Sequence, residues 1–164
     1  MKKAGMWAAF AAALYVLQTS LFTFLTIKGI TVDLLLLLTC SYGFLKGRRL
    51  GVLAGFLLGL MQDLASGTFF GINTFVKMTV GLLCGKLSDQ VFKDQFFLPL
   101  SAAFFSAFAN YLIPLAFVLM MGYNVNAAEH MKSVLPQMVV LQFLFAYPVH
   151  KLTMKFDEYV KKPK

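Results

Sequence analysis

Long apolar stretches without charge constrain this chain most. No Asp, Glu, Lys or Arg occurs between Met6 and Ile27, or between Phe96 and Met121. Each stretch is long enough to cross a bilayer as a helix, which takes about 20 residues. The whole chain is 59% hydrophobic and only 13% charged, whereas soluble domains carry roughly a quarter charged residues. Too little polar surface is available to coat a soluble globule, so the sequence predicts an integral membrane protein.

The apolar stretches favour helices over a β-barrel. A transmembrane strand alternates apolar and polar residues, whereas Leu34–Leu38 is five consecutive leucines. A helix satisfies its own backbone hydrogen bonds within the hydrocarbon region. The sequence therefore predicts an all-α membrane protein.

Six transmembrane helices in one bundle are predicted, forming a single polytopic domain over residues 1–164. Gly67 suits the left-handed position after the third helix, and Pro136 suits the first turn of the sixth. An uncleaved first helix is expected, because its apolar run is too long for the core of a signal peptide. The predicted helices cover about residues 6–27, 31–45, 50–65, 70–87, 96–121 and 136–150, followed by an amphipathic basic tail over 151–164.

The formal net charge of +8 is unevenly distributed along the chain. With six helices and the N-terminus inside, 12 of the 15 Lys and Arg residues fall on the cytoplasmic side. Lys28 and Lys132 fall outside, and Lys77 lies within the fourth helix. Such a bias is the positive-inside signal. It predicts a multi-pass protein of the bacterial inner membrane with both termini cytoplasmic, and it argues against a nucleic-acid partner.

No pattern in the chain points to catalysis, a metal or a cofactor. The two cysteines, Cys40 and Cys84, each lie in an apolar stretch without metal-ligand spacing. They read as small buried side chains. His130 and His150 fall at opposite surfaces, and no nucleophile with a base beside it is visible. The sequence therefore predicts a protein that is not an enzyme.

Glycines repeat every fourth residue in the third and fourth helices. Residues four apart share one helix face, so glycines at that spacing form a shallow groove in which another helix can approach closely. Packing within this subunit is the first interpretation, and packing against a partner's helix is the alternative. The predicted helix-packing residues are Gly51, Gly55, Gly59, Gly81 and Gly85.

Polar residues gather near the outer ends of the second, third and fourth helices. Charges in a membrane are costly unless they are paired or reach the interface. Asp63 and Lys77 are separated by one short hairpin, so an ion pair between them is predicted to pin that hairpin. The alternative is a contact for a ligand or partner. The predicted set is Asp33, Gln62, Asp63, Gly67, Gly71, Asn73 and Lys77.

Two segments outside the core helices show interfacial patterns. Asn126 and Glu129 have the spacing of a capping box, which predicts a short outer helix to about Ser133. In the tail, Leu152, Phe156 and Tyr159 fall on one helical face, which suits the inner-leaflet surface. A simple loop or a helix extension remains open for both.

The stretch Gly51–Phe75, GVLAGFLLGLMQDLASGTFFGINTF, resembles the hairpin of the MreD family of rod shape-determining membrane proteins. Val32-Asp33-Leu34-Leu35 is similar to that family's second helix, and Phe145-Ala-Tyr-Pro-Val149 ahead of a basic tail is similar to its end. The role of Lys77 does not follow from the resemblance and rests on the physical argument.

The resemblance implies a non-enzymatic scaffold or regulatory subunit of the bacterial cell-wall elongation machinery. Such a subunit would bind MreC and, through it, connect to MreB, to RodA and to a class B penicillin-binding protein that builds lateral peptidoglycan. The fold implied is similar to the S components of energy-coupling-factor transporters. That likeness leaves an alternative function open: a vitamin-binding subunit of an uptake transporter, with its site at the outer polar cluster. The short outer loop over residues 122–135 disfavours this alternative.

Overall fold

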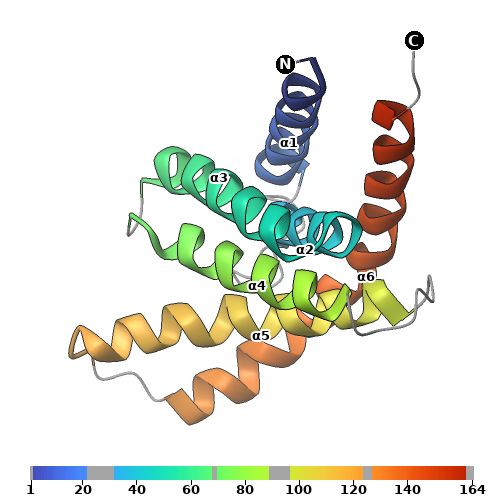
Figure 1. The fold of residues 1–164 in the computed structure, drawn as a ribbon. Coiled ribbons are helices and arrows are strands. Elements are labelled where there is room, and N and C mark those ends of the chain that lie inside the picture. The colour runs from blue at the N-terminus through green and yellow to red at the C-terminus, as the bar shows by residue number, and fades with distance from the viewer. Residues whose placement is uncertain (1, 22–31, 68–69, 89–96, 124–126, 162–164) are drawn as a thin grey trace.

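The computed structural model describes residues 2–21, 32–67, 70–88, 97–123 and 127–161, and nearly all of them are helical (Figure 1). The described residues form six helices, which confirms the all-α class. The helices are α1 (Lys2–Leu21), α2 (Leu34–Lys46), α3 (Arg48–Ser66), α4 (Ile72–Ser88), α5 (Phe97–Met120) and α6 (Ala127–Lys161).

Local capping sets the helix ends around α2 and α3. The carboxylate of Asp33 accepts a hydrogen bond from the Leu36 backbone N–H at 2.9 Å, so α2 begins directly after Asp33. Gly47, at φ 82°, turns the chain from α2 into α3. Gly67 adopts the left-handed conformation at φ 62° and ends α3, as the sequence predicts.

The predicted bounds of the second to fifth helices agree with the structure to within three residues. The first helix begins at Lys2 and is described as far as Leu21. Its predicted last turns lie outside the described residues.

The predicted start of the sixth helix at Pro136 is wrong. α6 runs without interruption from Ala127 to Lys161 and contains both Pro136 and Pro148. Neighbouring helices help membrane helices tolerate internal prolines, because they satisfy the freed backbone groups. The predicted short outer helix is therefore the first part of α6, and the tail is its last part. α6 changes direction between its orange and red portions (Figure 1).

α2 is the central helix of the bundle. Ten of its 13 residues are buried, and it contacts all five of the other helices. One apolar core lies between α2, α1 and α6, and a second lies between α2, α4 and α5. Cys40 and Cys84 are fully buried in the second core, which confirms them as buried side chains.

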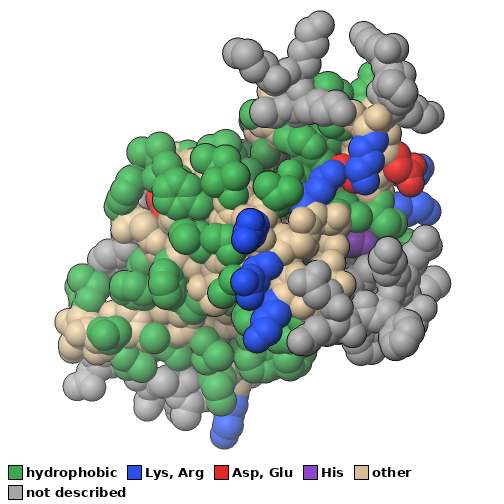
Figure 2. Space-filling view, viewed as in Figure 1, with side chains coloured by type: hydrophobic (Ala, Val, Ile, Leu, Met, Phe, Trp, Pro, Cys, Tyr) green, Lys and Arg blue, Asp and Glu red, His purple; other side chains and the backbone are tan. Residues whose placement is uncertain are grey.

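The surface is largely apolar, as a lipid-facing surface must be. Three helical segments of the described part are long and apolar enough to cross a membrane: Arg48–Ser66, Leu100–Met120 and Met131–Lys161. Figure 2 shows hydrophobic side chains over much of the visible face, whereas most Lys and Arg side chains lie between its middle and its right edge. The chain has the surface of a membrane protein.

Candidate functional site

The glycines of α3 lie directly against the backbone of α4. A Cβ added to Gly51 would stand 2.5 Å from the carbonyl oxygen of Gly81, a distance that real Cβ atoms do not show. Added Cβ atoms at Gly55 and Gly59 would meet the backbones of Lys77 and Thr74 at still shorter range. The two helices therefore touch backbone to backbone along this line, which we call the glycine seam.

The glycines of α4 complete the glycine seam from the other side. A Cβ at Gly81 would meet the Gly51 carbonyl, and one at Gly85 would lie 2.5 Å from the Cα of Arg48. All five predicted packing glycines are thus used within this chain. The alternative, a partner helix in the same groove, has no room because α4 occupies it.

Gly43 of α2 belongs to the same crossing and was missed by the sequence argument. A Cβ on Gly51 would lie 2.9 Å from the Cα of Gly43, and a Cβ on Gly43 would lie 3.1 Å from the Gly81 carbonyl oxygen. Gly43 lies four residues before Gly47 and eight before Gly51, so the four-residue glycine spacing of α3 already extends back to it in the sequence, a signal that the sequence argument did not use. Three helices therefore meet at one point where no side chain intervenes.

Asp63 holds the start of α4. Its carboxylate lies near the end of α3, is 2% exposed, and accepts hydrogen bonds from the backbone N–H groups of Gly71, Asn73 and Thr74 at 3.0, 3.1 and 2.9 Å. The Asn73 amide donates at 3.0 Å and the Thr74 hydroxyl at 2.6 Å. These N–H groups have no partner inside α4, and the negative charge also suits the positive end of that helix. Asp63 is thus a cap that α3 supplies to α4.

Lys77 pairs with Asp33, and the predicted pairing of Lys77 with Asp63 is wrong. The Lys77 Nζ lies 2.6 Å from Oδ2 of Asp33, and the two side chains are 0% and 6% exposed. Asp63 already accepts five hydrogen bonds from residues 71–74, at the start of α4. Lys77, one turn further into α4, instead reaches across to the N-terminus of α2.

Asp33 therefore caps α2 and also binds Lys77 of α4. One carboxylate oxygen caps α2 through Leu36, and the other accepts from Lys77. Gln18 of α1 adds a second cap: its Oε1 accepts from the N–H groups of Leu34 at 2.9 Å and Leu35 at 3.4 Å. Sequence reasoning missed Gln18, because a lone glutamine in an apolar helix gives no local signal. We call Gln18, Asp33, Asp63 and Lys77 the polar clamp.

The remaining predicted residues surround the polar clamp. Gly67 and Gly71 have positive φ angles of 62° and 98° and turn the chain between α3 and α4. Asn73 binds Asp63 through both its backbone and its side chain. Gln62 does not join the clamp, and its buried Oε1 has no hydrogen-bond partner within the described structure. Apart from Gln62, the charged groups of this cluster are engaged with one another or with helix ends. In the described part of the chain, no three His, Cys, Asp or Glu side chains gather as a metal site.

A second polar contact, missed by the sequence argument, lies where the last part of α6 meets the corner between α2 and α3. Asp157 is 3% exposed, and its two oxygens lie 2.6 Å from Lys46 and 2.7 Å from Lys161. Phe156 stacks on Phe10 of α1 with ring centroids 4.4 Å apart. The residues beyond position 150 thus pack on the bundle.

The three predicted apolar residues of the tail lie in different environments. Phe156 packs inward, whereas Leu152 and Tyr159 are 50% and 65% exposed. The buried face instead contains Thr153, Asp157 and Val160. An ion pair to another helix lets Asp157 take a buried position that its polarity alone argues against.

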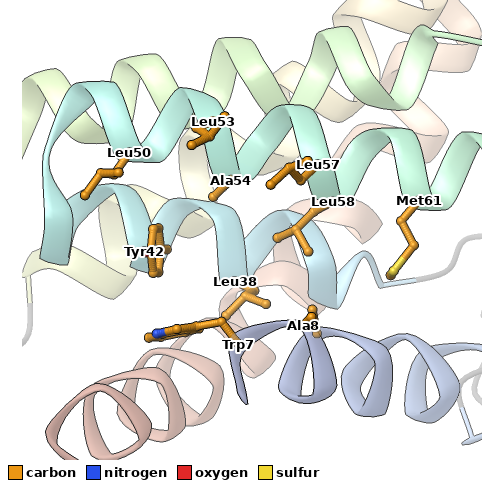
Figure 3. Close-up of a pocket in the computed structure, with 11 residues that line it drawn as sticks. Trp7, Ala8, Leu38, Tyr42, Leu50, Leu53, Ala54, Leu57, Leu58 and Met61 are labelled. Atoms are coloured by element: carbon orange, nitrogen blue, oxygen red, sulfur yellow. The ribbon is translucent and has the colours of Figure 1, made fainter. Parts of the chain in front are cut away.

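An apolar groove opens between α1, α2 and α3. Its volume is about 430 Å³, and α1 packs against α2 rather than closing over α3. Figure 3 shows its walls: Trp7 from α1 and Tyr42 from α2 lie near one end of the groove, with Leu50 above them, and Met61 lies at the other. Ala54 and Leu58 lie on the wall between. Sequence reasoning did not predict this groove.

A comparison with protein families covers nearly the whole chain. The model of the family described as rod shape-determining protein MreD matches residues 2–157. Comparisons with curated proteins and with solved structures found no match.

Proposed function

Because the chain belongs to the MreD family of rod shape-determining proteins, we propose that it is a non-enzymatic scaffold of the bacterial cell-wall elongation machinery. In this role it binds MreC and links it to the peptidoglycan synthase, formed by RodA and a class B penicillin-binding protein. The family match over residues 2–157 carries the proposal. The polar clamp supports it, because Asp33 and Lys77 bind each other and Gln18 and Asp63 cap helix starts, so that these groups hold helices together.

The proposed membrane arrangement has six spans with both termini in the cytoplasm. Three segments have the length for it. α2, with only 13 residues, is shielded by its neighbours, so its short length does not expose it to a mismatched bilayer. The N- and C-terminal ends of the described chain lie toward the same side of the molecule (Figure 1). Together with the positive-inside bias, this supports an even number of spans. The predicted likeness of the bundle to S components stays a prediction.

The outer end of the α3–α4 hairpin is the proposed contact for MreC. Beneath it, Asp63 and the glycine seam hold the two helices in register. At its tip, Leu64 and Phe70 are each 68% exposed. Large apolar side chains held on a rigid frame are typical anchors for a partner. The glycine seam itself is occupied, so the partner contacts the outward faces of the hairpin.

Depletion with complementation tests this proposal. Cells depleted of the protein should turn from rods into spheres, and the wild-type chain should restore them. In a mild detergent, the wild-type chain should retain MreC, whereas Leu64→Ser combined with Phe70→Ser should retain much less. Leu82→Ser, at a 41% exposed position of α4, serves as the matched control. Normal rod shape after depletion, together with no retained MreC, would refute the proposal.

No observation favours the vitamin-binding alternative. The groups that would bind a metabolite at the outer polar cluster, Asp33, Asp63, Asn73 and Lys77, are bonded to one another or to helix ends.

A further inference from the structure

The groove between α1, α2 and α3 presents apolar side chains to a hollow. Leu53 and Leu57 on its α3 wall are 53% and 56% exposed. Ala54 and Leu58 continue the same wall (Figure 3). Exposed apolar surface of this kind needs an apolar occupant, because water in such a groove would find no hydrogen-bond partners along its walls.

The dimensions of the groove select a narrow occupant. Leu50 to Met61 along α3 spans about 17 Å at 1.5 Å per residue, close to one leaflet of a hydrocarbon core that is about 30 Å thick. The groove is a partly open channel of about 430 Å³ along that length. A helix of about 10–12 Å diameter would lie largely outside such a channel. A single extended hydrocarbon chain is the occupant that follows its length.

Side chains with polar atoms and a basic side chain lie at one end of the groove. Trp7 and Tyr42 line the groove at the end where α3 begins (Figure 3), and aromatic rings with a polar atom prefer the headgroup level of a membrane. Arg49 precedes Leu50, is exposed, and lies one helical turn before Leu53 on the same side of α3. A guanidinium there matches the geometry of a phosphate.

We propose that this groove is a binding site for one anionic phospholipid. One acyl chain lies along α3 from Leu50 to Met61, and the phosphate binds at Arg49 beside Trp7 and Tyr42. The positive charge at one end of an otherwise apolar wall selects an anionic headgroup over a zwitterionic one. The proposal does not rest on the contact with MreC.

Native mass spectrometry of the delipidated full-length protein, titrated with phosphatidylglycerol or phosphatidylcholine, tests the site. The wild-type protein should retain one phosphatidylglycerol in about fivefold preference to phosphatidylcholine. Ala54→Trp places a ring in the groove and should lower retention of either lipid at least tenfold. Arg49→Gln should remove the preference for phosphatidylglycerol, because it lowers the retention of the anionic lipid more than that of phosphatidylcholine.

Two matched variants control for general effects. Ala65→Trp makes the same substitution at an exposed position of α3 outside the groove, and Lys86→Gln removes an exposed basic residue from the end of α4. Neither should change lipid retention. Equal retention of both lipids by the wild-type protein, or no effect of Ala54→Trp and Arg49→Gln beyond these controls, would overturn the proposal.

A photo-reactive lipid keeps the test decisive if Ala54→Trp does not fold. Phosphatidylglycerol with a diazirine in its acyl chain should label the wild-type protein mainly within residues 50–61 of α3 and at Trp7. Labelling spread evenly over the other exposed apolar positions, such as Leu100 and Leu144, would mean general bilayer contact only and would overturn the site.

Discussion

Lys77 shows how much this fold depends on single polar contacts. Its side chain is fully buried, and its ammonium group has Asp33 as an ion partner at 2.6 Å. A buried ion pair adds little net stability, because removing two charges from water costs about as much as their attraction returns. Losing only one partner is different, because it leaves the other charge buried and unpaired. The pair therefore specifies how α4 meets α2 more than it strengthens the bundle.

Lys77→Met and Asp33→Asn should each lower the free energy of unfolding by about 3–5 kcal/mol, since each leaves one buried charge unpaired. Asn retains an oxygen that can cap α2, so Asp33→Asn isolates the loss of charge. The double variant should lose clearly less than the sum of the two singles. Unfolding in mixed micelles with increasing SDS measures these differences.

Lys86→Met is the control for this cycle, because Lys86 is exposed on the same helix. It should change stability by no more than about 0.5 kcal/mol. If the losses of the two single variants simply add in the double variant, the buried pair is not an energetic unit.

Asp63 makes a second prediction at this scale. In Asp63→Ala, the N–H groups of Gly71, Asn73 and Thr74 lose the carboxylate that accepts them, and each unsatisfied donor costs about 1–3 kcal/mol where water does not reach it. Hydrogen–deuterium exchange should accelerate at the first turn of α4 and remain unchanged in α5. Asp63→Asn should fall between the wild type and alanine, because it keeps one acceptor oxygen. Equal protection of the first turn in all three proteins would show that Asp63 does not hold this end.

At the scale of elements, the glycine seam makes α3 and α4 a single unit. In lipid the helices gain nothing from burying apolar surface against each other, so close backbone packing supplies the attraction. The seam reaches from Gly59 near the outer end to Gly85 beside Arg48. A methyl group anywhere along it must push the helices apart.

Gly55→Ala should therefore destabilise the protein by about 1–3 kcal/mol, the usual cost of overpacking. Its new Cβ would meet the Lys77 backbone, which has no flexible end that could move aside. Gly5→Ala is the control, since nothing lies within 4 Å of a Cβ there, and it should be neutral or slightly stabilising through helix propensity. A Gly55→Ala protein as stable as wild type would mean that the helices are not in backbone contact.

Helices and their contact faces were predictable wherever one short stretch of sequence determines them. Charge-free runs and the glycine spacing identified most helices and the two faces that meet at the glycine seam. The partner of Lys77 was not predictable, because Asp33 is 44 residues away on another helix, whereas Asp63 is close along the chain. The start of α6 was also missed, because the proline rules for soluble helices do not hold where neighbouring helices cover the backbone. Gln18 lies at a tertiary contact that no local spacing encodes, whereas Gly43 continues the four-residue spacing of the α3 glycines through Gly47 and could have been identified from it.

At the scale of the whole molecule, the packing of the bundle supports the proposed orientation. Lys46, Asp157 and Lys161 tie the α2–α3 corner to the end of α6, so the basic segments lie together at one end. The outer hairpin tip with Phe70 lies beyond the opposite end of α3. In a chain with six spans, the α2–α3 corner and the end of α6 lie in the cytoplasm, and the hairpin tip lies outside.

Single cysteines should report this orientation directly. In a background with Cys40 and Cys84 replaced by alanine, Phe70→Cys and Lys132→Cys should react with a membrane-impermeant maleimide in intact spheroplasts. Arg49→Cys and Lys155→Cys should react only after the membrane is permeabilised, because the positive-inside bias places both positions in the cytoplasm. All four positions are exposed in the structure, so a lack of reaction reports the membrane side and not burial within the protein. Labelling of Lys132→Cys with protection of Phe70→Cys would place the two outer loops on different sides. That result would rule out six spans while leaving the packing of α2, α3 and α4 intact.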